Sequence, residues 1–491
     1  MRAALWKAHR WMGLITCVAI LLWGLSGLTH PIMTRLQPTP ASFMPPKGPS
    51  IKAHQTEPAA WLAQHGITRV HRLSTVTWRG QAYWLAHADE SSEGWLIDSQ
   101  SGKLEPHGEE KLARSLASHY SGRAENTIKS AKLVTAFGDD YLPVNRLLPV
   151  WAVRFDGDDD LTAYIDTRQM RLATLIDDRR AVLSQWFRWA HNWSFLDHWP
   201  RLQLVVMSVA LTIVMTSSLT GLYFWWRLRA NASQRLAARP FKRWHRRLGL
   251  VVALTSMCFG ISAMFHLWMT PNTQDAKVRS IQQTVSTDTI QTAWRALHQL
   301  DQPIQKLNWV ATPVASGWSV QPSGAADAKA QVAAMSEAHH HASATPRRPM
   351  TRLFVDAASG KVDKDEGPLA QRLALHFIGQ IQNQPAQTLG QPKLITQFEG
   401  EYGFLNKRLP VWRVSFEQPE VTRLYVETHT STLATSVNQL EAAEGWSFSV
   451  LHKWHIGPIN KDLRDAMSAT FALLHILVAL AGLCMFMRWR A

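Results

Sequence analysis

Four long apolar stretches stand out along the chain, at residues 11–30, 202–226, 248–269 and 466–487. Each is long enough to cross a hydrocarbon core of about 30 Å at about 1.5 Å of rise per residue. We therefore predict four transmembrane helices. The first lies where a signal peptide would, but its apolar run is longer and no small-residue cleavage motif follows, so we expect it to be retained.

Between the spans, the long apolar runs give way to a short alternation of apolar and polar positions. This period of two predicts β-strands at residues 82–86, 94–98, 150–155 and 161–166. The turn signal Ser-Gly-Lys occurs at 101–103 and again at 359–361. We expect a membrane protein with two large extracytoplasmic α+β domains, each preceded and followed by a transmembrane helix.

The predicted segments follow from these patterns. They are helix 1 in 1–33, the first periplasmic domain in 34–197, helix 2 in 198–226, a basic cytoplasmic linker in 227–247, helix 3 in 248–270, the second periplasmic domain in 271–464, and helix 4 with the C-terminal tail in 465–491.

Basic residues gather at one set of membrane ends. The chain has 52 Lys and Arg against 37 Asp and Glu, a net charge of +15. Thirteen of these cations lie before the first span, between the second and third, and after the fourth, with no acidic residue among them. The positive-inside rule then places both termini and the linker in the cytoplasm. Because the charge follows the membrane ends, it argues against nucleic acid as a partner.

An internal duplication organises the chain into two halves. The segment 7–14, KAHRWMGL, matches 243–250, RWHRRLGL, at an offset of 236 residues. Further along, 141–155 matches 402–416 at an offset of 261, which also relates the His-X-Trp segments 191–193 and 452–454. The second half is therefore longer by 25 residues, and the Ala/Ser/His-rich stretch at about 323–348, with its three histidines His339, His340 and His341, accounts for the insertion.

These motifs together resemble the PepSY-associated transmembrane helix family. The resemblance rests on the duplicated His-Arg-X-X-Gly-Leu start, the Ser-Gly-Leu at 26–28, the Ser-Gly-Lys turns, the His-X-Trp segments and the Gly-Leu pairs at 221–222 and 482–483. Within that family the chain is most similar to inner-membrane ferric-siderophore reductases of the FoxB and PiuB type. The resemblance implies a di-haem b protein with four helices and two periplasmic PepSY-like domains.

Four histidines are expected to form two layers across the membrane. His9 and His30 are 21 residues apart, and so are their duplicates His245 and His266. That spacing is about 31 Å of helix rise with about 60° of rotation, so each helix presents one histidine near each membrane face. Neutral imidazole is an axial ligand of b-type haem, and facing helices can hold the macrocycle. We expect these histidines to bind haem iron.

Three further histidines compete for the same role. His191 and His452 precede their spans and rival His30 and His266 for the periplasmic layer. His475 lies near the middle of span four, where its duplicate is a valine, and is either an asymmetric ligand or a packed core residue. Arg201 and Arg464, near the periplasmic ends of their spans, are candidate partners of haem propionates.

Simpler interpretations of these histidines remain open. The inner pair His9 and His245 also suits a basic segment facing lipid headgroups, and His191 and His452 also suit hydrogen-bonded interfacial turns. The three cysteines all lie in apolar stretches, so a disulfide framework, a CxxC motif and covalent haem attachment are excluded. Dinucleotide, P-loop, zincin and serine-hydrolase motifs are absent from the sequence, so this chain must receive electrons from elsewhere.

The predicted function is electron transfer through two haem b groups to a periplasmic acceptor, of which a ferric siderophore is the best candidate. The donor is a quinol or a cytoplasmic reductant. The alternative is a haem-free, membrane-anchored PepSY protein that binds peptides or regulates a protease. A transporter has less support, because the spans carry no acidic relay residue.

Overall fold

The structure is a computed structural model that describes residues 2–52, 57–228, 240–269, 278–323, 352–382, 390–417 and 421–490. The chain divides into two compact units. The helical unit comprises residues 1–37, 179–273 and 440–491, and the sheet unit comprises residues 38–178 and 274–439. Most of the insertion predicted at 323–348, including His339, His340 and His341, lies outside the described residues.

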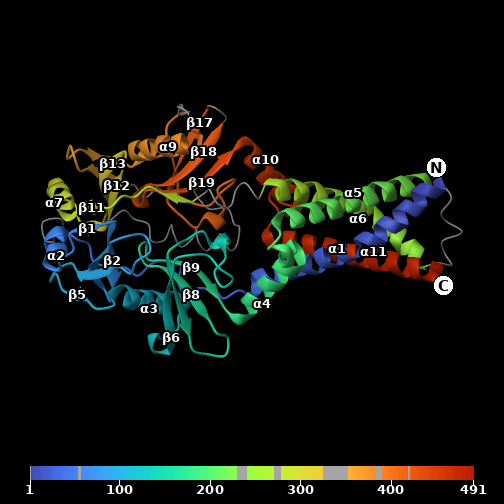
Figure 1. Cartoon of the computed structure of the whole chain (residues 1–491), viewed down its shortest axis with the longest axis horizontal. Helices are drawn as coiled ribbons and strands as arrows, with labels where there is room; N and C mark the ends of the chain where they lie inside the picture. Colours follow the sequence, from blue (N-terminus) through green and yellow to red (C-terminus); the bar gives the residue numbers. More distant parts are fainter. Residues whose placement is uncertain are drawn as a thin grey trace. The chain divides into compact units, whose positions relative to one another are not determined.

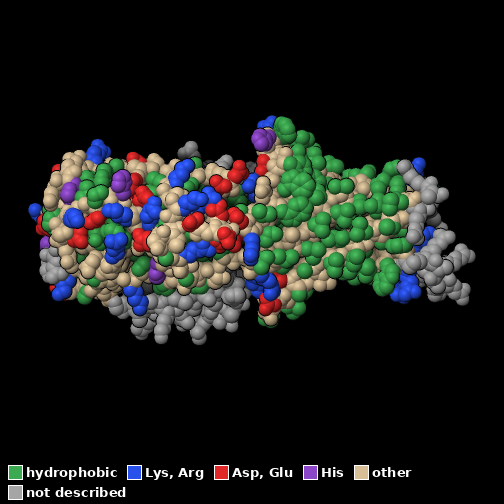
Figure 2. All heavy atoms as spheres, turned by 90° about the horizontal axis from the view of Figure 1, so that it is seen from below, with side chains coloured by type: hydrophobic (Ala, Val, Ile, Leu, Met, Phe, Trp, Pro, Cys, Tyr) green, Lys and Arg blue, Asp and Glu red, His purple; other side chains and the backbone are tan. Residues whose placement is uncertain are grey.

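Each predicted span lies inside one long helix of the helical unit (Figure 1). These helices are α1 (Arg2–Leu36), α5 (Pro200–Leu228), α6 (Pro240–Met269) and α11 (Lys461–Arg490). All four are long and apolar enough to cross a membrane, which confirms the four predicted helices and is compatible with a membrane protein. Figure 2 shows hydrophobic side chains covering the visible face of these helices, as expected of a surface that contacts lipid.

The helices extend beyond the predicted spans. The linker predicted at 227–247 is shorter in the structure, because α6 begins at Pro240, and residues 229–239 lie outside the described part. Proline is favoured in the first turn of a helix, where its missing N–H costs nothing. His245 and its basic neighbours therefore lie on a helix instead of in a loop.

Glycines allow the helices to approach in two equivalent places. α1 packs against α11, and α6 packs against α5. A Cβ atom on Gly24 of α1 would lie 2.7 Å from Ile476 of α11, and one on Gly260 of α6 would lie 2.7 Å from Met215 of α5. Gly24 and Gly260 are related by the 236-residue offset, and Met215 and Ile476 by the 261-residue offset.

Two short helices and two π-helical segments complete the helical unit. α4 (Asp178–Phe187) runs into a π-helical segment at Arg188–Asn192, and α10 (Gln439–Ser447) runs into another at Phe448–His452. Each segment ends on one of the two His-X-Trp motifs, so His191 and His452 occupy equivalent positions just before α5 and α11.

The sheet unit contains short helices and three main antiparallel sheets (Figure 1). Its first half has α2 (Pro58–Gln64), β1 (Arg69–Val70), β2 (Arg72–Trp78), β3 (Gln81–His87), β4 (Trp95–Asp98), β5 (Leu104–Glu105), α3 (Gly108–Ser121), β6 (Ile128–Val134), β7 (Val150–Phe155), β8 (Thr162–Asp166) and β9 (Arg171–Ile176). Its second half has β10 (Arg279–Ser280), β11 (Val285–Ser286), α7 (Thr287–Arg295), β12 (Ile304–Thr312), β13 (Ala315–Pro322), β14 (Leu353–Asp356), β15 (Val362–Asp363), α9 (Gly367–Gln382), β16 (Lys393–Ile395), β17 (Val411–Phe416), β18 (Thr422–Glu427) and β19 (Thr432–Asn438).

The four strands predicted from alternation are confirmed as β3, β4, β7 and β8, with small differences at their ends. Both Ser-Gly-Lys turns also form. The carboxylates of Asp98 and Asp356 accept the backbone N–H three residues later, at 2.7 and 2.9 Å. Gly102 and Gly360 follow with φ of +70° and +66°, a conformation that favours glycine.

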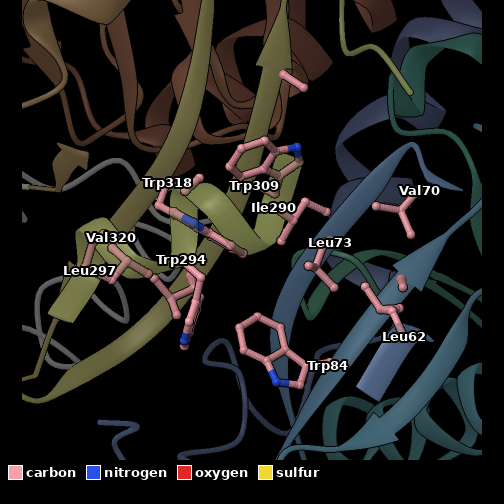
Figure 3. Packing of buried hydrophobic residues seen from close by; sticks show 14 of the residues in the cluster. Leu62, Val70, Leu73, Trp84, Ile290, Trp294, Leu297, Trp309, Trp318 and Val320 are labelled. Atoms are coloured by element: carbon pink, nitrogen blue, oxygen red, sulfur yellow. The ribbon is translucent and has the colours of Figure 1, made fainter. Parts of the chain in front are cut away.

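The two predicted domains share one sheet. Strands β2 to β5 and β12 to β15 form a single eight-stranded sheet, joined where Ser74 of β2 pairs with Asn308 of β12. Trp84, Trp294 and Trp318, from both halves, pack together on one face of this sheet (Figure 3). The sequence predicts two domains, but the buried residues on this face of the shared sheet form one cluster drawn from both halves.

The other face of the eight-stranded sheet is covered twice. Helix α3 packs between β2–β3 and the sheet β6-β7-β8-β9, with Leu112 and Leu116 fully buried. Helix α9 packs between β12–β14 and the sheet β10-β19-β18-β17-β16, with Leu369 and Leu373 in equivalent positions. Each half therefore repeats one layered arrangement of sheet, helix and sheet.

Reciprocal contacts join the two halves of the sheet unit. Arg146 donates to the side-chain oxygen of Asn406, and Lys407 Nζ donates to Asn145 Oδ1 at 2.9 Å. Residues 145 and 406 are related by the 261-residue offset, as are 146 and 407. Each side of the contact therefore uses the same two positions, as in the isologous interface of a twofold dimer.

Candidate functional site

Two histidines lie near the starts of α1 and α6 in matching surroundings; we call His9 and His245 the inner pair. A Cβ atom on Gly221 of α5 would lie 3.4 Å from His9 Cε1, and one on Gly482 of α11 would lie 3.6 Å from His245 Cε1. His9 lies within electrostatic range of His245. Because both positions are glycine, neither residue 221 nor residue 482 places a side chain against the imidazole ring beside it.

Hydrogen bonds define which ring nitrogen of the inner pair carries the proton. Thr220 Oγ1 donates its hydrogen to Ser217 O at 2.8 Å, so it accepts from His9 Nδ1 at 2.8 Å. The carbonyl of Val478 accepts from His245 Nδ1 at 3.3 Å. Both rings therefore carry hydrogen on Nδ1 and a lone pair on Nε2, which is the state of a histidine that binds a metal through Nε2.

Four more histidines gather at the other end of the helical unit; we call His30, His191, His266 and His452 the outer group. The sequence left the choice between His30 with His266 and His191 with His452 open. The structure brings all four together. His30 and His266 lie close enough to His191 and to His452 to lower the pKa of each.

Two phenylalanines connect the outer group into a series of rings. Phe187 stacks on His191 with centroids 4.6 Å apart, and Phe448 stacks on His452 at 4.7 Å. His30 lies 5.6 Å from the Phe187 ring and His266 lies 4.7 Å from the Phe448 ring. In the middle, His191 and His452 meet edge to face at 6.1 Å. In each half, one phenylalanine ring therefore contacts two histidine rings.

The hydrogen bonds of the outer group differ between the halves. Ser26 Oγ donates to Trp23 O at 3.0 Å, so it accepts from His191 Nδ1 at 3.0 Å. The indole N–H of Trp23 donates to His191 O at 3.1 Å and holds the backbone of the same residue. His191 is therefore fixed with its lone pair on Nε2.

The second half lacks those bonds. Within the part of the chain that the structure describes, neither Ser262 Oγ, at the position equivalent to Ser26, nor His452 Nδ1 has a hydrogen-bond partner, and both atoms are buried. The position equivalent to Trp23 is Phe259, which has no N–H to donate. His266 Nδ1 instead bonds a carboxylate, Glu444 Oε1, at 2.7 Å.

Burial keeps the two central histidines of the outer group neutral. Desolvation, followed by repulsion from neighbouring histidines, lowers the pKa of His191 to about 4. Desolvation, followed by His191 and Lys453, lowers the pKa of His452 to about 3. Neutral imidazole is the form that ligates metals, so both side chains are in the correct state at physiological pH.

His475 differs from the other candidates. Its Nδ1 donates to Phe471 O at 2.7 Å, and its Nε2 accepts from Ser256 Oγ at 2.8 Å. Both ring nitrogens are therefore occupied, and the residue is 9% exposed. These contacts favour a packed core histidine over a ligand at this position.

The sequence analysis missed the residues that orient the histidines. Ser26, Thr220 and Glu444 each bond a candidate histidine, and Phe187 and Phe448 stack on them. The duplication contained part of this signal, because the two phenylalanines are related by the same offset as His191 and His452. In the described residues, no group of three or more His, Cys, Asp and Glu side chains is arranged to hold a metal ion.

No protein-family model matches this chain, and a search of curated proteins finds no similar protein.

Proposed function

We propose that the protein is a bacterial inner-membrane reductase that carries two haem b groups and passes electrons across the membrane to a periplasmic acceptor. In this proposal the chain belongs with the PepSY-associated transmembrane helix proteins, its two halves are duplicates, its termini are cytoplasmic and its sheet unit is periplasmic. The acceptor is a ferric siderophore or a related ferric chelate. The donor is a quinol or a cytoplasmic reductant.

One observation carries the proposal: His9, His245 and His191 each donate their Nδ1 hydrogen to an oxygen atom and so present the Nε2 lone pair. Metal-ligating histidines almost always have this outer hydrogen bond, since it fixes the tautomer and the ring orientation. Histidines that only contacted water or lipid headgroups would have no need for the same ring nitrogen to be hydrogen-bonded in all three of them.

The residues of the helical unit fit two haem groups. The inner pair supplies two imidazoles from two different helices, and the outer group supplies up to four. The glycines at 221 and 482 place no side chain against the inner imidazoles, and the buried, unpartnered nitrogen of His452 marks an unsatisfied site in the outer group. Haem b would supply reversible one-electron chemistry at iron.

The chain's own residues would perform three tasks. The histidines hold and orient the metal, and Ser26, Thr220 and Glu444 fix the histidine rings. Phe187 and Phe448 stack on the outer imidazoles and exclude water from that layer. The apolar helices keep the path between the two layers dry, which favours electron transfer over side reactions with solvent.

The deciding experiment is an absorbance spectrum of the full chain purified in detergent, oxidised and then reduced with dithionite, with a pyridine-haemochrome assay. We expect a Soret band, a sharp α band and about two b haems per chain. Reoxidation of the reduced protein by a ferric siderophore would then test the acceptor. A colourless protein after expression with added haem would refute the reductase and leave the haem-free binding or regulatory function.

A further inference from the structure

Two basic residues distinguish the outer end of the second half from that of the first. Lys453 follows His452, and Arg464 lies in the first turn of α11. The equivalent residues of the first half, at the 261-residue offset, are the neutral Asn192 and Gln203. The duplication therefore gives an internal reference for what these two positions do without a charge.

In the first half, Gln203 completes the turn that follows His191. Its amide donates to the backbone carbonyls of Asn192 at 2.9 Å and Trp193 at 3.3 Å, and to Asp197 Oδ1 at 3.0 Å. The neutral side chain of Gln203 therefore has a structural role, since it stabilises this turn.

In the second half, Arg464 is only 7% exposed. Among the residues that the structure describes, no carboxylate lies within 4.0 Å of its guanidinium and no side-chain hydrogen bond satisfies it. The adjacent Asp465 is held by Lys461 at 2.9 Å and by Arg35 at 3.6 Å. Glu444, the other nearby acid, is bonded to His266 at 2.7 Å.

Lys453 adds a second positive charge to the same place. Its ammonium lies 5.0 Å from the centroid of the Phe448 ring, which also stacks on His452. Lys453 lies within electrostatic range of Arg464 and of His30. Two cations are therefore close together beside the outer group.

A guanidinium that is largely buried without an anion loses part of its hydration, and nothing compensates for that loss. Such a site is stabilised when an anion with oxygen acceptors binds, and a carboxylate matches the planar donors of arginine. The two propionate carboxylates of haem are the anions that the proposed function would bring to this layer.

We propose that Arg464 and Lys453 bind the carboxylates of the outer haem and raise its reduction potential. The inference rests on the proposed function. Reduction adds an electron to the haem, and neighbouring cations favour the more electron-rich state. At the outer group, Arg464 and Lys453 have no charged counterpart in the first half, so the two halves differ in charge there.

The duplication supplies the variant that tests this. Lys453→Asn with Arg464→Gln gives the second half the residues of the first, and it is made in a His9→Ala background so that the outer haem is observed alone. A potentiometric titration of the α band, with the full chain in detergent, measures the potential. We expect the equilibrium constant for reduction to fall at least tenfold, which is about 59 mV for a one-electron couple.

Two control variants separate charge from folding. Arg179→Gln removes an exposed cation from α4, which leads into the turn that carries His191, and should change the constant less than twofold. Arg464→Lys keeps the charge and should restore most of the potential. If the double variant fails to fold, Arg464→Gln and Lys453→Asn are titrated singly, and equality of both with the parent protein would overturn the proposal.

The outcomes also distinguish the inference from the proposed function. Absence of haem from the parent protein refutes the function. Haem with a potential that the double variant leaves within twofold refutes the inference alone. Phospholipid is the other source of anionic oxygens. If, in nanodiscs of phosphatidylcholine with and without phosphatidylglycerol, the double variant loses bound phosphatidylglycerol while the potential is unchanged, the site binds lipid phosphate and the proposal fails.

Discussion

The turn that carries His191 and the turn that carries His452 have the same backbone form and the same stacked phenylalanine, with rings 4.6 and 4.7 Å apart. Their hydrogen bonds differ. His191 Nδ1 bonds Ser26, whereas the equivalent atoms of His452 and Ser262 have no partner in the described structure. A change from Trp23 to Phe259 removes a further bond. The two halves thus place equivalent histidine rings in equivalent positions, but hydrogen bonds fix the ring of His191 more strongly than that of His452.

The sheet unit shows the same kind of difference at a buried carboxylate near the start of α3 and of α9. Burial raises the pKa of Glu109, but His87 and hydrogen bonds from Thr167 and the Gly94 N–H outweigh it and lower the pKa to about 2. Burial also raises the pKa of Glu366, and there it outweighs the nearby charge of Arg352 and the hydrogen bonds from the hydroxyls of Ser319 and Thr428.

These comparisons teach that a duplicated backbone does not impose duplicated electrostatics. Packing keeps the elements in equivalent places, because apolar faces and close helix contacts tolerate little change. The polar partners of one ionisable group can change without moving the backbone. Two equivalent positions can therefore acquire different proton and ligand affinities.

The largest effect is expected from substitutions in the inner pair, where the surroundings of the two histidines match. Replacing His9 with Ala should lower the haem content from about two to about one per chain, and replacing His245 with Ala should do the same, because each removes one axial ligand of the same haem. A pyridine-haemochrome assay measures it. His475→Ala is the control and should retain both haems, since both nitrogens of His475 are already bonded. Unequal losses at positions 9 and 245 would contradict the equivalence.

The second prediction concerns the two buried carboxylates. Glu109→Gln should destabilise the protein at pH 7 by about 3 kcal/mol, since the folded pKa lies well below the ordinary value of 4.5. The contribution of a lowered pKa is present above about pH 4.5 and is lost as the pH falls through about 2. The raised pKa of Glu366 has the opposite sign, because its stabilising contribution is present at low pH and is lost as the pH rises.

Urea unfolding of the full chain in detergent, followed by tryptophan fluorescence at pH 7, pH 5 and pH 3, checks this pair. Glu366→Gln should leave the midpoint at pH 7 unchanged or higher, in contrast to Glu109→Gln. Equal destabilisation by both variants at pH 7 would show that the two sites are electrostatically alike.

A smaller effect is expected from the serines of the outer group. Ser26→Ala removes the bond that fixes His191 and should weaken haem retention by about 10- to 100-fold. Ser262→Ala removes a hydroxyl that bonds nothing in the described structure and should have little effect. Transfer of haem to excess apomyoglobin gives the relative affinities. Equal effects of the two substitutions would remove the distinction between His191 and His452.

The smallest effect concerns helix packing. Gly24→Ala should destabilise the protein by about 1–3 kcal/mol, because the new methyl group would meet the branched side chain of Ile476 at 2.7 Å. Gly260→Ala should cost less, since its neighbour Met215 is unbranched and can move aside. Thermal unfolding in detergent measures the difference, and a larger loss at position 260 would contradict this ranking.

Much of the fold follows from local patterns in the sequence. Hydropathy identifies the four spans because a bilayer requires a long apolar run whatever the neighbours are. Alternation identifies β3, β4, β7 and β8 for the same kind of reason, since successive side chains of a strand point to opposite faces of the sheet. The offsets of 236 and 261 residues and the spacing of His9, His30, His245 and His266 are likewise visible without any structure.

Other features depend on which surfaces meet. The merging of two expected domains at Ser74 and Asn308 is invisible to any local pattern, because sheet register depends on residues more than 200 positions apart. The same holds for the bond from His191 to Ser26 and for the buried charge of Arg464. A helix sequence determines which face is apolar, but the rotation and crossing of packed helices decide which side chain each histidine contacts.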